Sequence, residues 1–429
     1  MRDTGLFHGC RARALPYIAS LSLGIVGLGG CSIIDDALDV QAPSRVEGKD
    51  LENPEVADLL TASALSSFVC AFGHYTVSGG LLGDELVDAD LSSNDDDIDS
   101  RRVNASSPGT ANNCGSSDFI PGPYLPLAGA RYQADNTLRL LNSWTDEQVA
   151  GRLNFIVTAA AYGGYAYLLI GEGWCSATFD IGPEETRAQV LQRAIARFDQ
   201  AIAGAQTSSN GTMLALARIG RARALLDLGQ KSQARTEAQL VGPNVNVQAT
   251  YSSDAGRVQN LIWLRNIRPA PQYAIGPVYR NMMFAGVPDS RVRVTLSSAK
   301  ASNPTVPLWV QSKYSDDSSP ISIARSAEAQ LIIAEVDGGQ AAVAIINALH
   351  AKAGLPPFAS TNPTEIQSQI VYERRAEFFL ESQHLGDYNR YALPFDPAPG
   401  QPFFFGGVYG NARCFPLPDV ERLNNPNVN

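Results

Sequence analysis

The stretch Ile370–Tyr391 reads IVYERRAEFFLESQHLGDYNRY and places Glu373, Glu377 and Glu381 at strict four-residue spacing. On one continuous helix, three carboxylates at this spacing lie on a single face. Like charges four residues apart destabilise an isolated helix by about 0.2–0.5 kcal/mol per pair. The stretch therefore predicts a helix whose acidic face meets cationic groups from elsewhere in the fold.

The expected partners of these glutamates are basic residues, with Arg325, Arg374 and Arg375 as candidates. A buried ion pair adds little net stability, but removing one partner strands a charge at a cost of about 3 to 5 kcal/mol. A second interpretation treats the carboxylates as a catalytic pair of the kind that hydrolyses glycosides. Their register along the whole helix favours a structural charge network, and we expect no enzyme activity.

The composition is that of an acidic globular protein. The chain has 429 residues, of which 45% are hydrophobic, so it is long enough to bury a large core. Its 43 acidic residues outnumber 33 basic ones, and the sequence pI is near 5.0. This charge balance argues against a nucleic-acid partner.

The N-terminus is typical of an export signal. Three arginines precede or flank an apolar stretch at residues 15–28 that is short for a membrane-spanning helix. The LGGC that ends at Cys31 resembles the lipobox of bacterial lipoproteins, which implies acylation of this cysteine, palmitate included, and a membrane anchor. We predict a signal peptide at 1–30, a tether at 31–50 and a single domain at 51–429.

Four further cysteines would remain in the exported chain, namely Cys70, Cys114, Cys175 and Cys414. In an oxidising compartment they can form two disulfides, with three possible pairings. Buried free thiols are the alternative.

Hydrophobic periodicity predicts a body made of helical hairpins. Asn53–Pro54 and the pair Thr145 and Gln148 are typical of helix starts, and apolar residues recur at helical spacing over Arg187–Ala205. Met213–Val241 then reads as a hairpin with Gly229 at its turn, which resembles a tetratricopeptide unit.

A second hairpin is expected over Ser322–Pro357, with Gly338 and Gly339 at the turn. A third helix is expected to begin at Asn362 and to continue through Tyr391. Between the hairpins, residues 242–320 lack a sustained helical period and predict loops and short strands. The predicted fold is therefore mostly α, a tetratricopeptide-like scaffold with a loop-rich insert.

The order of four C-terminal segments resembles the SusD/RagB family of outer-membrane nutrient-uptake lipoproteins. The segments are RSAEAQLIIAE, INALHAKAGLP, YERRAEFFLESQHLGDYNRY and FPLPDVERLNNPNV, within Arg325–Val428. The resemblance implies a lipid-anchored cell-surface protein of the outer membrane that binds oligosaccharide or another oligomeric nutrient. It also implies a TonB-dependent, SusC-like transporter as partner. A structural envelope adaptor that uses its helical repeats to bind proteins is the alternative.

Aromatic residues outside the helical pattern are the candidate ligand contacts. Aromatic faces can stack on sugar rings, and the candidates are Trp263, Trp309, Phe403, Phe404, Phe405 and Tyr409. Burial of these rings beneath a loop is the competing interpretation for each of them.

Signals for metals and cofactors are sparse. Asp95, Asp97 and Asp99 begin like a calcium loop, but Ser100 and Ser106 replace its glycine and closing glutamate. We therefore expect a solvated acidic loop, with a looser calcium site as the alternative. The histidines at positions 74, 350 and 384 lack metal-ligand spacing and are expected at the surface or at helix caps.

Overall fold

The computed structural model describes residues 52–91, 95–107, 114, 122–254, 258–423 and 425–428. All of them fall in one compact unit that spans residues 51–429. The predicted signal peptide, Cys31 and the tether lie outside the described residues.

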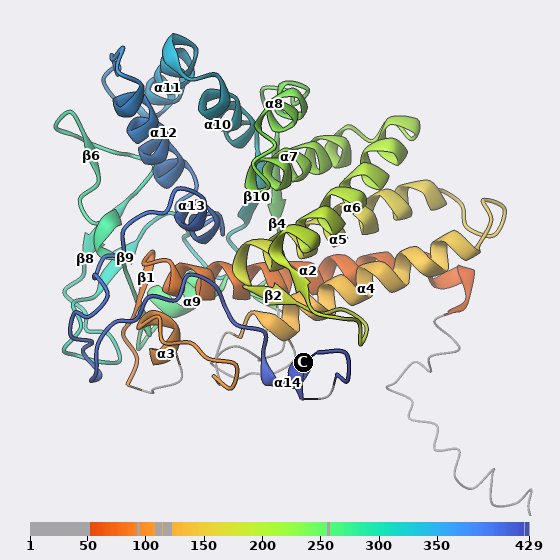
Figure 1. Cartoon of the computed structure of the whole chain (residues 1–429), viewed down its shortest axis with the longest axis horizontal. Helices are drawn as coiled ribbons and strands as arrows, with labels where there is room; N and C mark the ends of the chain where they lie inside the picture. The colour runs from red at the N-terminus through yellow and green to blue at the C-terminus, as the bar shows by residue number, and fades with distance from the viewer. Residues whose placement is uncertain are drawn as a thin grey trace, which may run out of the picture. The chain divides into compact units, whose positions relative to one another are not determined.

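The described chain is mostly helical, which confirms the predicted fold class (Figure 1). The helices of the N-terminal half are η2 (Pro54–Val56), α2 (Ala57–Leu82), α3 (Asp96–Asp99), α4 (Tyr124–Ser143), α5 (Arg152–Gly173), α6 (Arg187–Thr207), α7 (Gly211–Asp227) and α8 (Lys231–Gln239). Those of the C-terminal half are α9 (Leu261–Asn266), η5 (Pro277–Tyr279), α10 (Ser326–Asp337), α11 (Gly339–Ala353), α12 (Pro363–Glu377), α13 (His384–Arg390) and α14 (Asp419–Arg422).

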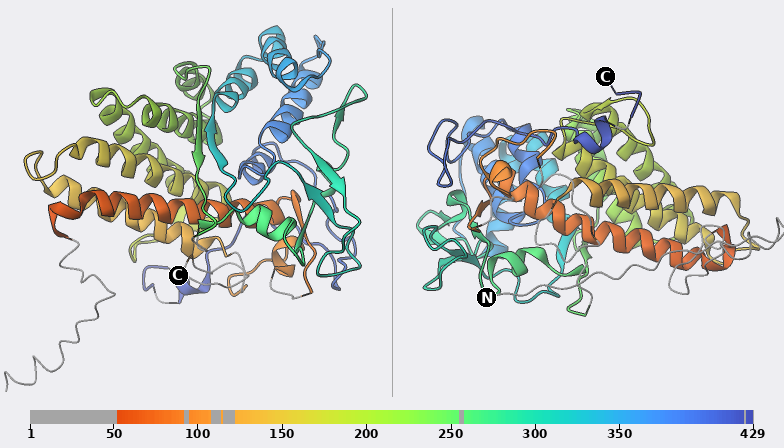
Figure 2. Two further views of the ribbon diagram at one scale, coloured as in Figure 1. Left: turned by 180° about the vertical axis from the view of Figure 1, so that it is seen from behind. Right: turned by 90° about the horizontal axis from the view of Figure 1, so that it is seen from below.

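The strands are short and pair only in antiparallel twos among the described residues. The pairs are β1 (Leu86–Asp88) with β5 (Tyr273–Ile275), β2 (Ser176–Ala177) with β3 (Glu185–Thr186), β4 (Asn246–Ala249) with β10 (Ile321–Arg325), β6 (Met283–Phe284) with β7 (Val287–Pro288), and β8 (Val294–Leu296) with β9 (Trp309–Gln311). Most of them lie in the predicted insert, beside the helical stack (Figure 2).

Long helices pack in succession to form the core. α4 packs between α2 and α5, and α5 to α8 continue the stack toward α10 (Figures 1 and 2). Small residues allow the close approach, because a Cβ added at Gly164 or Gly220 would meet the Phe198 ring at 2.6 or 2.4 Å. Both α2 and α5 contain apolar stretches long enough to cross a membrane, and 56% and 78% of those stretches are buried inside the fold.

The predicted hairpins are confirmed, with two shifts of boundary. α7 and α8 flank Gly229, whose φ is 73°, and α10 and α11 meet at Gly338 and Gly339. Thr145 and Gln148 do form a side-chain contact, but α5 begins only after Gly151, whose φ of 71° interrupts the helical path. Ser322 lies in strand β10 rather than in a helix.

The expectation of one helix through Tyr391 is wrong. α12 ends at Glu377, and the chain turns at Leu380 and Ser382, which have φ values of 57° and 69°. Contacts with distant segments hold this turn, because the Leu380 amide donates to the Glu85 carboxylate at 2.7 Å. Glu381 therefore lies in a buried turn and not on the helix face that carries Glu373 and Glu377.

Candidate ligand-binding site

Residues 400–410, here called the aromatic loop, form a tight hairpin near the C-terminus. The amide of Gly400 donates to Tyr409, and that of Phe403 donates to Gly407, at 2.8 and 3.0 Å. Gly406 and Gly407 close the turn with φ values of 104° and 77°, which favour glycine. The hairpin therefore presents the intervening phenylalanines on a defined backbone.

The aromatic loop divides the predicted rings into buried and exposed ones. Phe403 and Tyr409 are 3% and 5% exposed, so they are structural rings. Phe404 is 42% exposed and Phe405 is half-buried, with 4.6 Å between their ring centroids. Phe404 and Phe405 are therefore the two aromatic-loop phenylalanines that can offer a face to a ligand.

A buried arginine ties the aromatic loop to a segment some 300 positions earlier in the chain. The guanidinium of Arg101 lies between the Phe395 and Tyr409 rings, 4.3 and 4.6 Å from their centroids. It also pairs with Asp84 and donates to Gly410 O. Arg101 is only 1% exposed, so it fixes the loop rather than meeting a ligand.

The next residue, Arg102, is exposed beside the phenylalanines. Its guanidinium carbon lies 5.6 Å from the Phe403 centroid, and its Nη2 lies 3.4 Å from Gly406 O. Arg102 is held by Ser100, whose hydroxyl accepts from Nε at 2.9 Å. Arg102 with Phe404 and Phe405, here called the aromatic–arginine patch, combines ring faces with a hydrogen-bond donor. Sequence reasoning missed both arginines because their proximity to the loop is purely tertiary.

The two predicted tryptophans lie apart from this patch in the insert. Trp309, on β9, is half-buried, and the Arg280 guanidinium lies 5.4 Å from its centroid. Trp263, on α9, is half-buried against the main core. Asn260 caps that helix by accepting from the Trp263 amide at 3.1 Å. Both tryptophans therefore pack against the main core, and both remain partly accessible.

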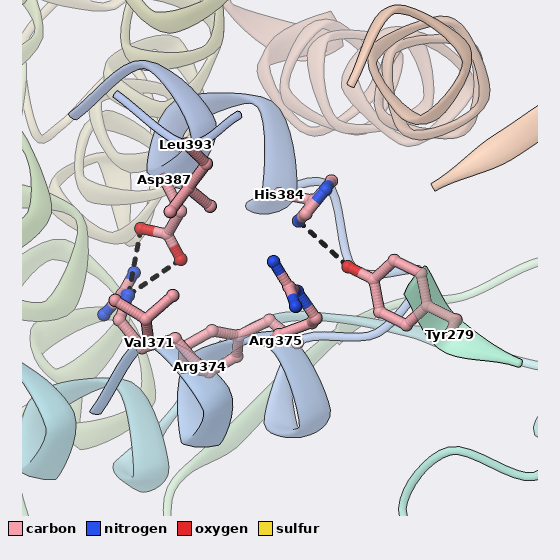
Figure 3. A pocket seen from close by; sticks show the side chains of 8 residues that line it. Tyr279, Val371, Arg374, Arg375, His384, Asp387 and Leu393 are labelled. Carbon is pink, nitrogen blue, oxygen red and sulfur yellow. Dashed lines mark hydrogen bonds and ion pairs between the residues drawn. The ribbon is translucent and has the colours of Figure 1, made fainter. Parts of the chain in front are cut away.

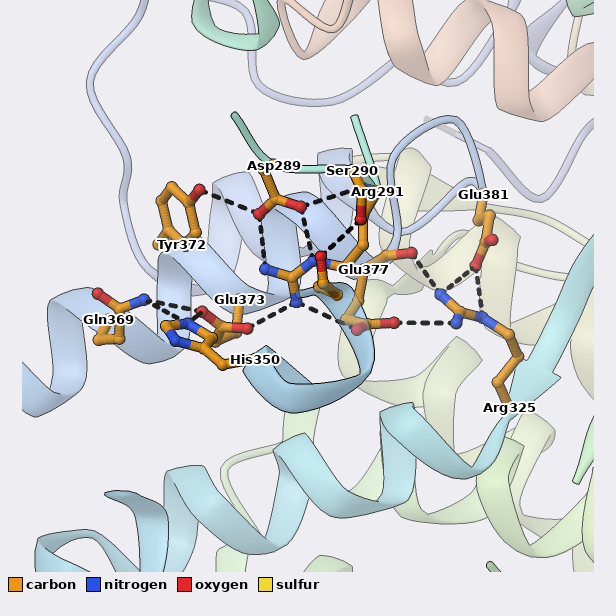
Figure 4. Close-up of polar contacts among 11 residues, drawn as sticks. Asp289, Ser290, Arg291, Arg325, His350, Gln369, Tyr372, Glu373, Glu377 and Glu381 are labelled. Atoms are coloured by element: carbon orange, nitrogen blue, oxygen red, sulfur yellow. Dashed lines mark hydrogen bonds and ion pairs between the residues drawn. The ribbon is translucent and has the colours of Figure 1, made fainter. Parts of the chain in front are cut away.

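The glutamates of the quoted stretch meet cations from three other segments (Figure 4). Arg291 Nη1 lies 2.6 Å from Glu373 and 3.1 Å from Glu377, while its Nη2 contacts Asp289. Arg325 bridges Glu377 and Glu381 at 3.0 and 2.9 Å. We call the three glutamates and their partners the glutamate network.

Lys313 and His350 complete the glutamate network. Lys313 Nζ lies 2.7 Å from Glu381 and also donates to Phe379 O. His350 Nε2 lies 2.7 Å from Glu373, and its Nδ1 faces Pro356 O at 2.6 Å. His350 is 1% exposed, so the expectation of a surface or capping histidine is wrong here. Because the carboxylates face arginine, lysine and histidine at short range, their arrangement is that of a structural network and not of a water-filled catalytic cleft.

Arg374 and Arg375 do not contact the three glutamates. One and two positions after Glu373, they project from other sides of α12. Arg374 pairs with Asp387 at 2.7 Å, while Arg375 points toward His384 and Tyr279 across a small pocket (Figure 3). That pocket holds about 10 Å³, which is room for about one water molecule. It is too small for a sugar.

A larger open groove of about 710 Å³ lies between helical hairpins. Its lining comes from α6, α7, α8, α10, α12 and α13 and includes Arg187, Lys231 and Arg390. Arg390 contacts Asp387 and Glu335, and its guanidinium covers the Tyr391 ring at 4.2 Å. The groove combines charged side chains with apolar ones, and Arg390 covers one face of the Tyr391 ring.

The aspartates around α3 are buried, so the expectation of a solvated acidic loop is wrong. Asp88, Asp95 and Asp99 are at most 6% exposed. Burial raises the pKa of Asp95 to about 7, and burial together with Asp95 raises that of Asp88 to about 10. Asp88, Asp95, Asp96 and Asp97, here called the aspartate cluster, each keep an oxygen without a hydrogen-bond partner among the described residues.

The four remaining cysteines form the disulfides Cys70–Cys114 and Cys175–Cys414. Among the residues that the structure describes, only Cys70, His74 and Cys114 bring three metal-ligating atoms within 4.8 Å of one another. The calcium alternative for Asp95, Asp97 and Asp99 therefore finds no such convergence in the described chain.

A protein-family model matches the C-terminal part of the chain. The SusD family model matches residues 308–413, which include helix α12 and the whole aromatic loop. No curated protein sequence matches the chain closely enough to count as a relative.

Solved structures with the same fold are numerous. A SusD superfamily protein from Parabacteroides distasonis is 12% identical, with a TM-score of 0.66 over 90% of this chain and 99% of that chain. A SusD-like carbohydrate binding protein from Bacteroides vulgatus is 14% identical, with a TM-score of 0.62 over 88% and 97%. Surface glycan-binding protein A from Bacteroides uniformis is 13% identical, with a TM-score of 0.61 over 85% and 98%. At these identities the likeness is one of fold.

Proposed function

The chain is a member of the SusD/RagB family, and on that premise we propose that it is a non-catalytic glycan-binding protein of the cell surface. Two structural neighbours are named for carbohydrate or glycan binding, which supports this ligand class. The exposed Phe404 and the half-buried Phe405, together with Arg102, are the observation that carries the proposal. No closed cavity is needed, because an oligosaccharide can lie across exposed rings.

The chemistry of the aromatic–arginine patch suits a sugar. The C–H faces of a pyranose stack on aromatic rings, which bring large contact area at low entropic cost. The Arg102 guanidinium has five N–H donors for hydroxyl or ring oxygens. Phe403 and Arg101 lie beneath and keep the patch in place, so less ordering is required when a ligand binds.

We further propose that the protein is lipid-anchored at Cys31 in the outer membrane and delivers its ligand to a TonB-dependent, SusC-like transporter. The lipobox-like LGGC and the family membership support this arrangement. The groove beside Arg390 is the better candidate for contact with a protein partner, because it combines charged groups with apolar lining residues and Arg390 covers one face of its Tyr391 ring.

The alternative is an envelope adaptor that binds only proteins through its stacked helical hairpins. The charged groove favours this reading, whereas the exposed phenylalanines do not require a protein partner to explain them. Glycan binding and adaptor function predict different behaviour in a ligand screen.

A first test is electrophoresis of the soluble chain, without its N-terminal 31 residues, through native gels that contain single polysaccharides. Retardation by a subset of glycans is expected, together with chromatograms that show the glycan uncleaved. The matched variants are Phe404→Ala, which should lose retardation, and Leu423→Ala, an exposed leucine elsewhere that should keep it. Equal mobility in every polysaccharide, with co-purification of a β-barrel partner, would favour the adaptor.

A further inference from the structure

One of the two disulfides differs from the other by a neighbouring histidine. Cys70 and His74 are four residues apart on α2, so their side chains share a helix face. Cys114 reaches the same face through the disulfide, with a Cα separation of 6.1 Å from Cys70. The two sulfurs and a ring nitrogen of His74 lie within 4.8 Å of one another.

His74 has a ring nitrogen that is available to bind a metal ion. Its Nδ1 is buried and has no hydrogen-bond partner among the described residues. Burial, with a contribution from Arg265, lowers the pKa of His74 to about 4, so the imidazole is neutral at physiological pH. A neutral imidazole with a free nitrogen lone pair is the form that binds metal.

The second disulfide supplies a contrast within the same molecule. Cys175 and Cys414 are joined with a Cα separation of 5.2 Å, but the described chain brings no third ligating side chain to them. Cys175 follows the C-terminal end of α5, and Cys414 precedes the buried Phe415. Any metal chemistry that needs two sulfurs and an imidazole is therefore specific to the first disulfide.

We propose that reduction of the Cys70–Cys114 disulfide converts it into a Cys2His site for a thiophilic divalent cation such as Zn²⁺. A dithiol or phosphine supplies two electrons, the S–S bond breaks, and two protons complete the thiols. The reductant becomes a disulfide or a phosphine oxide, the latter with oxygen from water. Zinc then displaces both thiol protons and binds two thiolates and the His74 nitrogen.

The dimensions and chemistry fit this assignment. Bonds of about 2.3 Å to sulfur and 2.0 Å to nitrogen place the ligands of a tetrahedral zinc roughly 3.5–4 Å apart. The present separations of up to 4.8 Å require only small side-chain movements. Thiolate and imidazole ligands select zinc over calcium or magnesium. Three protein ligands leave a fourth position for water or another small ligand.

The test is a titration of the full-length protein with Co²⁺, a spectroscopic stand-in for zinc, before and after reduction by a phosphine. Reduced wild-type protein is expected to take up one equivalent with a thiolate-to-cobalt absorption band, which zinc then removes. The oxidised protein should show no band. Circular dichroism before and after reduction reports whether the chain stays folded.

Three variants assign the ligands. Cys70→Ser with Cys114→Ser should abolish the band, and Cys175→Ser with Cys414→Ser should leave it unchanged. His74→Ala, which keeps both cysteine pairs, should weaken binding by more than the roughly 10–100-fold that an outer-shell change alone produces. The proposal is overturned if His74→Ala binds as tightly as wild type or if the band follows Cys175 and Cys414. It is equally overturned if reduced protein takes up no cobalt or unfolds.

Discussion

Two regions of this molecule bury carboxylates, and they differ in how the buried negative charge is compensated. In the glutamate network, Glu373, Glu377 and Glu381 each face one or two cationic side chains at 2.6–3.1 Å. In the aspartate cluster, Asp88 and Asp95 are equally buried, yet each keeps an oxygen without a hydrogen-bond partner among the described residues. Burial raises the pKa of these aspartates, whereas the glutamates are compensated by neighbouring cations.

The two regions thus differ in whether cationic side chains contact the buried carboxylates. The glutamate network joins α12 to the insert and to β10, and thus holds the family-defining segment together. Asp95, Asp96 and Asp97 of the aspartate cluster precede Arg101 and Arg102 in the chain, and the Arg102 amide donates to Asp97 O at 2.8 Å. Because burial raises the pKa of Asp88 and Asp95, the aspartate cluster is expected to make the stability depend on pH.

The largest expected effect comes from breaking the paired region. Arg291→Ala removes the partner shared by Asp289, Glu373 and Glu377 and should lower the free energy of unfolding by about 3–5 kcal/mol. Urea denaturation measures the change. The matched control is Arg139→Ala, whose contact with Glu52 is exposed at both ends and should cost less than about 1 kcal/mol. Similar losses for the two variants would contradict the network.

A smaller effect on stability is expected when a change of pH titrates the aspartate cluster. An unfolded aspartate has a pKa near 3.8, and burial raises that of Asp95 to about 7. Between these two pKa values the folded state binds the proton more tightly than the unfolded state. The free energy of unfolding therefore falls as pH rises, by at most about 1.4 kcal/mol per pH unit.

Asp95→Asn isolates this contribution, because asparagine can still accept from the Tyr273 hydroxyl. The free energy of unfolding is measured from about pH 4 to about pH 8, a range that spans both pKa values. It should change less with pH in the variant than in wild type. The variant should also be the more stable protein at the alkaline end. An unchanged slope would mean that Asp95 does not carry the pH dependence.

The smallest effect is expected from adding a cationic side chain beside the aspartate cluster. Leu91, which is 68% exposed, follows Asp90 at the edge of the aspartate cluster. Leu91→Lys should stabilise the protein by about 0.2–1 kcal/mol at low salt, and added salt should remove the gain. Leu296→Lys, at another exposed leucine, is the control, and thermal melts compare the two. An equal gain at both positions would exclude a local charge effect.

Local patterns predicted the helical scaffold well. Residues 187–205 lie in α6, and glycines at 229 and 338 end helices where the sequence predicts turns. These features depend on neighbours within a few positions, which the sequence displays directly.

Features set by distant contacts were not predictable in the same way. The end of α12 depends on a hydrogen bond from Leu380 to Glu85, and the true partner of Glu373 is Arg291 from the insert. In the aromatic loop, the division between the buried Phe403 and the exposed Phe404 follows from packing against Arg101 and Arg102. The doublet of arginines after the aspartates was the available signal, but nothing in the sequence joins it to residues 400–410.

The most direct test of glycan capture is isothermal titration of the best-retained oligosaccharide into wild-type protein and into the double variant Phe404→Ala, Phe405→Ala. Each stacked ring is worth about 0.5–1.5 kcal/mol beyond its buried area, so the double variant should bind about tenfold more weakly or worse, with an unchanged melting temperature. Trp263→Phe, in the half-buried core position on α9, should bind like wild type. Equal affinity of the wild type and the double variant would contradict capture at the aromatic–arginine patch.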